Sequence, residues 1–493
     1  MNTVRDHNSE VRAHGSLVAA ALLATYMQAV NISIPNAAVL HVQGGLSMTD
    51  DEIGWVFSSY IAASALVMPL THWLAGRYGR KKVFLVSLAL FSLALILDTL
   101  ATTPLQFVSA RILQGAASGT LAPLSMAILL HELPPLRHGR IGMAWSVIAL
   151  LGILSGPAIG GWLGEYVGWH AIFYFSLPMA AFIALAVSVY LKEKKLHKLE
   201  HFDFFGLATF SMGIAGLQMM LDRGERLEWF ASPEIWVEAI AAALGFYLYI
   251  VHVLTKDHHF LHKALFKDRN FRVATVMFFA FGFVLLPTLA LTSPMLEELL
   301  GYPADTAGYL SIPRGAALVT ALLLTWRAPS RFDNRWLILG GVALVVYGNW
   351  RMLGYSPLMD WWPVAVAGAI QGAGLGMLMP ALTRAAFSTL DPQFRAEGTV
   401  LFNLSRLYGS TIGIAILQIY FYCNTQSMHL ALANHLTPYR TGPLTGQALA
   451  MMNELVTGQA AVVAVIGQFK LLMIAMLIVS PLALFLRKPR AGI

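Results

Sequence analysis

Apolar runs of about 20 residues, the length a helix needs to cross a bilayer, recur along this whole chain. The chain has 493 residues, of which 57% are hydrophobic and 12% are charged. Soluble domains carry roughly a quarter charged residues, so this composition is typical of a protein surrounded by lipid. The sequence therefore predicts an all-α polytopic membrane protein.

The runs divide into about 14 predicted spans in the order six, two and six. The first six fall within residues 1–192, and two more follow a charged linker within 193–272. The last six fall within 273–493, which includes a long outer loop at 424–468. The expected limits are roughly 17–40, 53–75, 83–100, 105–130, 141–163, 171–191, 204–221, 235–254, 273–295, 307–326, 336–354, 363–387, 399–422 and 468–486.

The positive charge of the chain is an orientation signal. The formal net charge is +7, and most of the 33 Lys and Arg residues fall in short loops on one side of the predicted membrane. Such an excess marks the cytoplasmic side, so both termini are expected there and no nucleic-acid partner is needed to explain the basicity. Cys423 is the one cysteine, which excludes an intramolecular disulfide. The first span lacks a cleavage pattern and is expected to be retained.

A glycine-rich stretch, LGILSGPAIGGWL, occupies the fifth span. Gly152, Gly156 and Gly160 recur every fourth residue, and small residues at this spacing allow helices to approach closely in lipid. Pro157 lacks an amide hydrogen and should bend or loosen the helix. An ordinary helix contact would need one such glycine pair, so the density of glycines favours a hinge or gate.

Five arginines lie in predicted spans or at their ends: Arg111, Arg314, Arg351, Arg384 and Arg406. Two of them, Arg111 and Arg406, stand in matched segments. Arg111 opens the sequence RILQGAASG, and an arginine at membrane depth is costly unless it faces water or a partner. The alternative is an interfacial position, because Arg111 lies two turns from the start of its helix and could snorkel. A functional role is favoured. Arg406 poses the same problem and could be neutralised by a carboxylate or by an anionic substrate.

Together these segments resemble the major facilitator superfamily, in its fourteen-span branch of drug:proton antiporters, and most closely the EmrB-type exporters. The glycine-rich stretch, with Gly161 included, matches the antiporter motif that seals the path in exporters. Arg111, Gln114 and Gly115 match a motif whose arginine is linked to proton transfer. The resemblance implies two six-helix halves that contain inverted repeats, with the two central helices as an insertion.

The loop HWLAGRYGRKKVF resembles the cytoplasmic signature loop of the family through Gly79, Arg80 and Lys81. In the family this loop controls opening of the cytoplasmic side. A plain positive-inside anchor is the alternative. Gly76 replaces the acidic residue of the family, and His72 replaces its leading glycine, so the latch is expected to work differently or weakly.

The first span, TYMQAVNISIPNAAV, matches the branch at Asn31 and departs from it at two positions. Tyr26 stands where the pattern has aspartate, and Gln28 stands where it has threonine. A buried carboxylate is the simplest proton carrier, because burial brings its pKa toward neutrality. Asp98 and Glu132 are expected to be interfacial, so the sequence retains the exporter framework without an obvious proton site.

The predicted function is export of multiple drugs or toxic compounds, driven by the proton gradient and working by alternating access in a bacterial inner membrane. Two alternatives stay open: a dedicated exporter of one anionic metabolite, such as an aromatic acid or siderophore, and a non-transporting receptor. No enzymatic activity, metal or cofactor is expected, and no phosphate-binding glycine loop is found. The residues expected to face the substrate cavity are Tyr26, Gln28, Asn31, Gln371 and Arg406.

Two further segments predict a partner outside the membrane. The sequence LDRGERLEWF is similar to EmrB-type exporters, which implies a periplasmic membrane-fusion adaptor and an outer-membrane channel. The long outer segment contains ALAMMNELV, which could form an amphipathic helix that packs on such a partner. The alternative is that this run lies on the membrane surface or against the chain's own helices.

Overall fold

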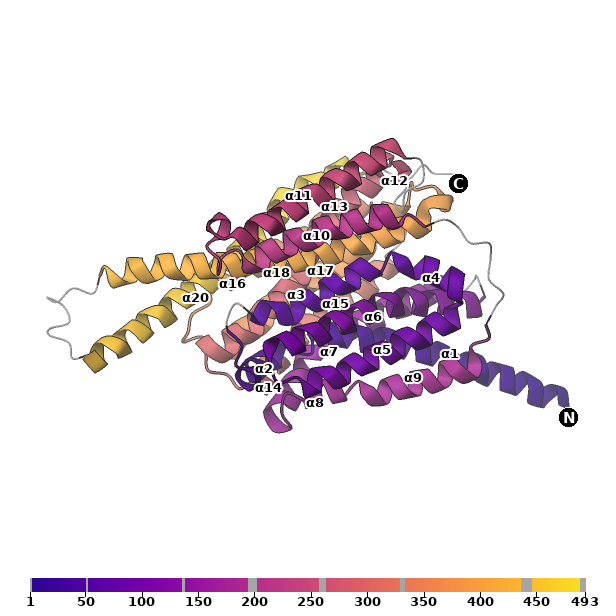
Figure 1. Cartoon of the computed structure of the whole chain (residues 1–493), viewed down its shortest axis with the longest axis horizontal. Coiled ribbons are helices and arrows are strands. Elements are labelled where there is room, and N and C mark those ends of the chain that lie inside the picture. Colours follow the sequence, from indigo (N-terminus) through magenta and orange to yellow (C-terminus); the bar gives the residue numbers. More distant parts are fainter. Residues whose placement is uncertain are drawn as a thin grey trace.

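The computed structural model describes residues 2–49, 52–134, 138–193, 202–256, 263–328, 333–435 and 446–487. Within these ranges the regular elements are all helices, which confirms the predicted all-α class. Figure 1 shows the early helices gathered in one bundle and the later helices in a second bundle beside it, with their axes roughly parallel.

The N-terminal half begins with a long helix and ends before the charged linker. Its elements are α1 (Asn2–Ser33), η1 (Asn36–Ala38), α2 (Val39–Leu46), α3 (Ile53–Val67), α4 (Leu70–Tyr78), α5 (Arg80–Leu100), α6 (Pro104–Glu132), α7 (His138–Tyr166), α8 (Ala171–Tyr174) and α9 (Leu177–Tyr190). The axes of α3 and α4 differ by 55°, and the break falls at Met68 and Pro69. Proline has no amide hydrogen and suits the start of a new helix, which explains the break.

The two additional helices are α10 (Phe204–Arg223) and α11 (Pro233–Thr255), joined through η3 (Trp229–Ala231). The C-terminal half follows. Its elements are α12 (Lys263–Lys267), α13 (Arg269–Pro294), η4 (Met295–Leu299), α14 (Ala304–Tyr309), α15 (Ile312–Arg327), α16 (Asn334–Met352), α17 (Trp361–Phe387), η5 (Pro392–Phe394), α18 (Arg395–Ala433), α20 (Gly446–Val479) and η6 (Ser480–Phe485).

The number of helices able to span a membrane is 12 in the described part of the chain, or 13 when the bent pair α3–α4 is included. The predicted span at 336–354 corresponds to α16, a 19-residue helix that is not among these because Arg335 and Arg351 lower its apolar character. The count of 14 therefore stays a prediction, whereas the polytopic helical architecture is confirmed.

The predicted loop at 424–468 is mostly helix. The helix α18 continues to Ala433, and α20 begins at Gly446, so the two spans predicted at its borders are longer than expected. In Figure 1 the two helices extend together beyond one end of the bundle. We call these extensions, residues 424–433 and 446–467, the arms. The predicted spans end where polar residues appear, because such residues leave the lipid. Polar residues do not stop a helix once it is outside the membrane, so α18 and α20 continue.

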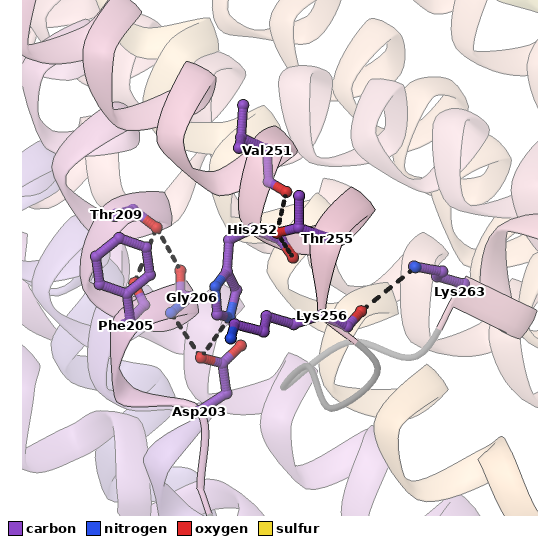
Figure 2. A network of polar contacts seen from close by, with 9 residues as sticks. All are labelled: Asp203, Phe205, Gly206, Thr209, Val251, His252, Thr255, Lys256 and Lys263. Atoms are coloured by element: carbon purple, nitrogen blue, oxygen red, sulfur yellow. Dashed lines mark hydrogen bonds and ion pairs between the residues drawn. The ribbon is translucent and has the colours of Figure 1, made fainter.

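The additional helices lie across the boundary between the halves. On α10, Gln218 donates to the Thr411 carbonyl of α18 at 3.4 Å, and Ser58 of α3 donates to Asp222 at 3.0 Å. At the other end of this pair, Figure 2 shows Asp203 capping α10 through the Gly206 amide at 2.7 Å, with His252 of α11 at 2.9 Å from the same carboxylate. The contact between Asp203 and His252 thus joins α10 to α11, whereas the polar contacts at the other end join α10 to α18 and α3.

Candidate proton-coupling and gating site

Arg111 lies completely buried on α6, between α1 and α3. Its Nε donates to the Val56 carbonyl at 3.0 Å, its Nη2 donates to the Asn31 carbonyl at 3.3 Å, and its Nη1 donates to Gln114. The guanidinium carbon lies 4.6 Å from the ring centre of Tyr60, a cation–π distance. The side chain therefore makes its contacts inside the bundle and does not snorkel to the surface.

Asn31 on α1 joins the same network. Its side-chain oxygen accepts from Gln114 at 3.1 Å, and its amide nitrogen donates to Ser176 at 2.7 Å and to the Met27 carbonyl at 2.7 Å. Asn31 and Gln114 are both fully buried. The structure thus brings a residue expected in the substrate cavity together with the arginine motif, within one hydrogen-bonded core.

Gly115 explains how α6 comes so close to α3. A Cβ atom at this position would collide with the Tyr60 carbonyl, and one at Gly119 would collide with the Ser64 carbonyl. The two glycines lie one turn apart, on the helix face that meets α3. The close approach is what lets Arg111 stack on Tyr60 and reach the Val56 carbonyl.

Asp98 is buried in a way that its position in the sequence does not indicate. It stands near the end of α5, as expected for an interfacial residue, but its side chain is 0% exposed. Among the described residues, neither of its oxygens has a hydrogen-bond partner. A position close to a helix end can be read from the sequence, whereas the direction of the side chain depends on how α5 packs against α6. Glu132, by contrast, is half-buried and lies 3.5 Å from His131.

Gln371 forms a second buried network in the C-terminal half. Its amide donates to Asn349 on α16 at 3.0 Å and to Thr288 on α13 at 3.3 Å. Gln371 is 0% exposed, so this residue, which was expected to line the cavity, lies inside its own bundle in this conformation. Arg314 on α15 is also buried, and its Nη2 donates to the Leu285 carbonyl at 3.0 Å, whereas its Nε and Nη1 have no partner in the described part of the chain.

Three of the residues expected in the cavity are half-buried: Tyr26, Gln28 and Arg406. The Tyr26 hydroxyl lies 2.9 Å from the Ser155 hydroxyl of α7, and the Gln28 carbonyl accepts from Tyr60 at 3.2 Å. Arg406 lies about 16 Å along α18 from its first residue, at 1.5 Å per residue. Within the described part of the chain, Arg406 has no ion-pair partner.

The glycine-rich stretch of α7 packs on α1 along one face. A Cβ on Gly152 would come within 2.8 Å of the Tyr26 carbonyl, and one on Gly156 would come within 2.8 Å of the Ile34 amide nitrogen. At Gly160 it would collide with the Ile34 carbonyl. The every-fourth-residue spacing therefore produces the close backbone approach that the sequence predicts.

The adjoining face of α7 contacts the other half of the molecule. Gly161 lies against the Ala304 carbonyl, and Gly308 lies against the Pro157 carbonyl, so α7 and α14 meet backbone to backbone. Tyr166 donates to Asp305 at 3.1 Å beside this contact. The two halves are thus joined at the end of the bundle that the charge pattern predicts to face outward.

The predicted signature loop forms the turn between α4 and α5. Gly79 adopts φ +90°, a conformation that favours glycine, and a Cβ there would collide with the Glu193 side chain. Lys81 donates to the Ser188 carbonyl on α9 at 2.6 Å. Arg80 begins α5 and is exposed. A Cβ atom on Gly76 would meet no other atom within 4 Å among the described residues, so a side chain at this position would have space.

No group of three or more potential metal ligands was found among the described residues. The polar core of the molecule instead consists of amides, hydroxyls, buried arginines and a few isolated carboxylates. Such groups can bind and release protons and can hold helices in alternative positions.

Comparison with known proteins places this arrangement in a family. The model of the Major Facilitator Superfamily matches residues 19–414, which is most of the chain. The chain belongs to the Major Facilitator Superfamily. Multidrug export protein EmrB of Escherichia coli is 31% identical over 435 residues, which cover 88% of this chain and 84% of the relative.

A second relative within the superfamily is fatty acid resistance protein FarB of Neisseria gonorrhoeae. It is 30% identical over 455 residues, which cover 90% of each protein. Among solved structures, a bacterial homolog of the human lysosomal transporter Spinster, in an inward-facing and unoccupied conformation, matches with a TM-score of 0.67. This match has 13% identity and covers 97% of this chain and 99% of the other, so it shows the shared fold. The chain is thus a multi-pass membrane protein with a transporter fold.

Proposed function

We propose that this protein exports small amphipathic compounds across a bacterial inner membrane in exchange for protons. Its relatives are named for multidrug export and fatty acid resistance, which supports an exporter of amphipathic molecules. The observation that carries the proposal is the α7 seam, where one glycine-lined helix packs on α1 and on α14 of the opposite half. Contacts of this kind can separate and re-form as the halves rock.

Alternating access requires that the two ends of the transporter open in turn. At the predicted outer end, the Gly161–Ala304 and Gly308–Pro157 contacts close the seam between the halves. At the other end, the contacts described for Lys81 and Ser188 lie within the N-terminal half. This distribution supports a state that is closed outward, and both termini are proposed to lie in the cytoplasm.

The proposal is tested by measuring efflux in a pump-deficient bacterial strain and in everted membrane vesicles. Ethidium and tetraphenylphosphonium serve as cationic probes, and oleate serves as an anionic one. Gradient-dependent extrusion that an uncoupler abolishes is the expected result. Extrusion that persists without the gradient, or its absence with every probe when the protein is correctly inserted, would contradict the proposal and favour the receptor alternative.

A preference for anions is the second candidate function, and Arg406 is the observation that favours it. A partly exposed arginine in the middle of a span, without an ion-pair partner among the described residues, fits a water-filled cavity rather than lipid. A carboxylate substrate would neutralise this charge. Arg406→Gln is expected to lower oleate efflux at least about tenfold, equivalent to about 1.4 kcal/mol of lost binding, while ethidium efflux is kept. Equal losses for both probes would remove the preference for anions.

We also propose that a periplasmic membrane-fusion adaptor, and through it an outer-membrane channel, binds the arms. The arms extend past the bundle, and His429 and Asn453 join them at 3.0 Å. Leu449, Met451 and Leu455 are 56%, 66% and 62% exposed, which leaves apolar surface for a partner. An open groove of about 390 Å³ lies at the base of the second arm, lined by Glu298, Leu299, Pro357, Met451, Glu454, Leu455, Gly458, Gln459 and Val462.

The arm proposal predicts that replacing residues 437–460 with a short Gly/Ser linker abolishes co-purification of the adaptor and cellular resistance. Transport in vesicles should survive, because the spans lie outside the deletion. A milder variant, Met451→Ser with Leu455→Ser, removes the apolar surface and keeps the helix. Full co-purification with either variant would exclude the arms from the interface.

A further inference from the structure

Asp98 combines two properties that conflict if its carboxyl group is charged. It is 0% exposed, and neither oxygen accepts a hydrogen bond within the described structure. It also has no ion-pair partner within 4 Å there. A carboxylate that is removed from water without a hydrogen bond or a counter-ion is strongly disfavoured, so such a group takes up a proton. The side chain in this conformation is therefore the neutral acid.

The surroundings of Asp98 contain one buried cation that can respond to its charge. Arg111 on α6 interacts electrostatically with Asp98, and Tyr60 on α3 interacts with both. The nearby elements α8 and α9 contribute apolar groups, such as the fully buried Ile172, Phe173 and Ile183. On α4 the basic residues are His72 and Arg77, and Arg77 lies 5.6 Å from the ring centre of Trp73. The helix α4 ends next to the first residue of α5, whereas Asp98 lies near the last residue of α5.

The guanidinium of Arg111 is held by neutral acceptors. It donates to the carbonyls of Val56 and Asn31 and to Gln114, and none of these carries a charge. A bond from arginine to a carboxylate is shorter and stronger than a bond to a neutral acceptor. Loss of the Asp98 proton would therefore draw Arg111 away from its contacts with α1 and α3.

We propose that Asp98 is a proton-binding site of the transport cycle, and that its charge determines which groups Arg111 contacts. When Asp98 is protonated, Arg111 ties α6 to the Asn31 carbonyl of α1. When the proton leaves to water, the carboxylate pairs with Arg111, and the contact with α1 is released. The helix α1 is the one that packs on Gly152, Gly156 and Gly160 of α7, so the change at Asp98 reaches the seam between the halves.

This proposal rests on the proposed proton-coupled export and supplies the carboxyl group that Tyr26 does not. Asp222 on α10 offers a matched control, because it is also a carboxyl group within the membrane region. Its oxygens accept from Ser58 at 3.0 Å and from Gln218 at 2.9 Å, so its charge is partly compensated. Glu238 of α11 lies near Asp222 and is itself held by Arg223 at 2.7 Å.

The first test measures protonation without any substrate. Purified wild-type protein carrying ¹³C-labelled aspartate is titrated while infrared spectroscopy follows the carbonyl band of protonated carboxyl groups. Because Asp222 is itself a carboxyl group that can carry a proton, the band is compared in Asp222→Asn and in the double variant that adds Asp98→Asn. A protonated aspartate at pH 7 that is present in Asp222→Asn and vanishes in the double variant is the expected result. Its absence from Asp222→Asn, or its persistence in the double variant, would overturn the proposal, and the Asp222→Asn measurement decides even if the double variant does not fold.

The second test measures coupling in proteoliposomes loaded with ethidium. Asp98→Asn copies the neutral acid in size, so it is expected to keep its thermal stability and to lose gradient-driven efflux at least tenfold. Asp222→Asn is expected to stay within twofold of the wild type, and Asp98→Glu is expected to recover part of the activity. Full activity of Asp98→Asn beside an active wild type would refute the proton site alone. An inactive wild type would instead count against the proposed function.

Discussion

The two halves of the molecule share one pattern of helix packing, but the buried arginine stands on a different helix of the pattern in each half. In the N-terminal half, Gly115 of α6 lies against the Tyr60 carbonyl of α3, and in the C-terminal half, Gly372 of α17 lies against the Arg314 carbonyl of α15. One turn further, Gly119 meets Ser64 and Gly376 meets Leu318, again through backbone carbonyls. The helix pairs α3–α6 and α15–α17 thus repeat one packing motif.

Within that motif the glutamines correspond and the arginines do not. Gln114 and Gln371 each precede the contact glycine. Gln114 donates to Asn31 on α1, the first span of its half, and Gln371 donates to Thr288 on α13, the first span of the other half. Arg111 stands three residues before Gln114, where the C-terminal half has Gly368. Arg314 instead stands at the position that corresponds to Tyr60. A Cβ atom on Gly368 would lie 3.5 Å from the Arg314 Cβ.

The difference changes what each arginine can do. Arg111 has three acceptors and an aromatic ring, whereas Nε and Nη1 of Arg314 have no partner. In the N-terminal half, the third predicted span, α5, carries Asp98, a carboxyl group that can gain and lose a proton. In the C-terminal half, the third predicted span, α16, carries Asn349, whose amide does not titrate. The repeat therefore teaches that proton coupling is expected in the first half.

The largest expected effect comes from breaking the N-terminal network. Arg111→Ala should abolish gradient-driven efflux, because it leaves the carbonyls of Val56 and Asn31 without their donor. Arg111→Lys keeps the charge and loses the planar fork of donors, so it should recover only part of the activity. Proteoliposome efflux of ethidium measures both. Undiminished efflux from the alanine variant would make the arginine a structural residue and erase the difference between the halves.

The next effect concerns the seam that joins the halves. Gly156→Leu should lower efflux at least about tenfold and keep membrane insertion, because the side chain pushes α7 away from α1 at a site without space. Gly142→Leu on the same helix is the control, because a Cβ there meets one flexible methionine end at 3.4 Å. If both leucine variants export equally well, the tight packing of α7 has no part in gating.

A smaller and opposite effect is expected at the C-terminal arginine. Arg314→Met should raise the free energy of unfolding by about 1–3 kcal/mol, because it removes a buried cation with unpartnered nitrogens and keeps the volume. Arg111→Met should lower it. Thermal unfolding in detergent gives the sign for each variant. Destabilisation by Arg314→Met would indicate a partner for Arg314 and make the two arginines alike.

The smallest effect separates the two glutamines. Gln371→Leu should lower the free energy of unfolding by about 1 kcal/mol, because two hydrogen bonds to neutral groups are lost. Efflux should be unchanged. Gln114→Leu should cost more, because Arg111 loses an acceptor for a charged donor. The difference in unfolding free energy between the two variants is the measured quantity. Equal costs would mean that Arg111 draws no extra stability from Gln114.

Sequence patterns were sufficient for the helical class, the family and the close packing of α7, because these depend on residue type and spacing. They grouped Arg111, Gln114 and Gly115 as one motif, and the structure brings these residues together. They did not give the direction of side chains. Asn31 and Gln371 were expected at a cavity and lie in bundle interiors, and the position of Asp98 near a helix end did not indicate that its side chain is buried. Such directions depend on which helices pack together, and the spacing along one helix does not contain that information.

The arms make the C-terminal half longer than the membrane is thick. The helix α18 has 39 residues, or roughly 58 Å at 1.5 Å per residue, of which about 30 Å cover the bilayer core. Because the arm and the span are one continuous helix, the arm acts as a rigid lever. Each degree of tilt of the C-terminal half would move the arm tip by about 0.5 Å. A protein attached there would sense every turn of the transport cycle as a mechanical displacement.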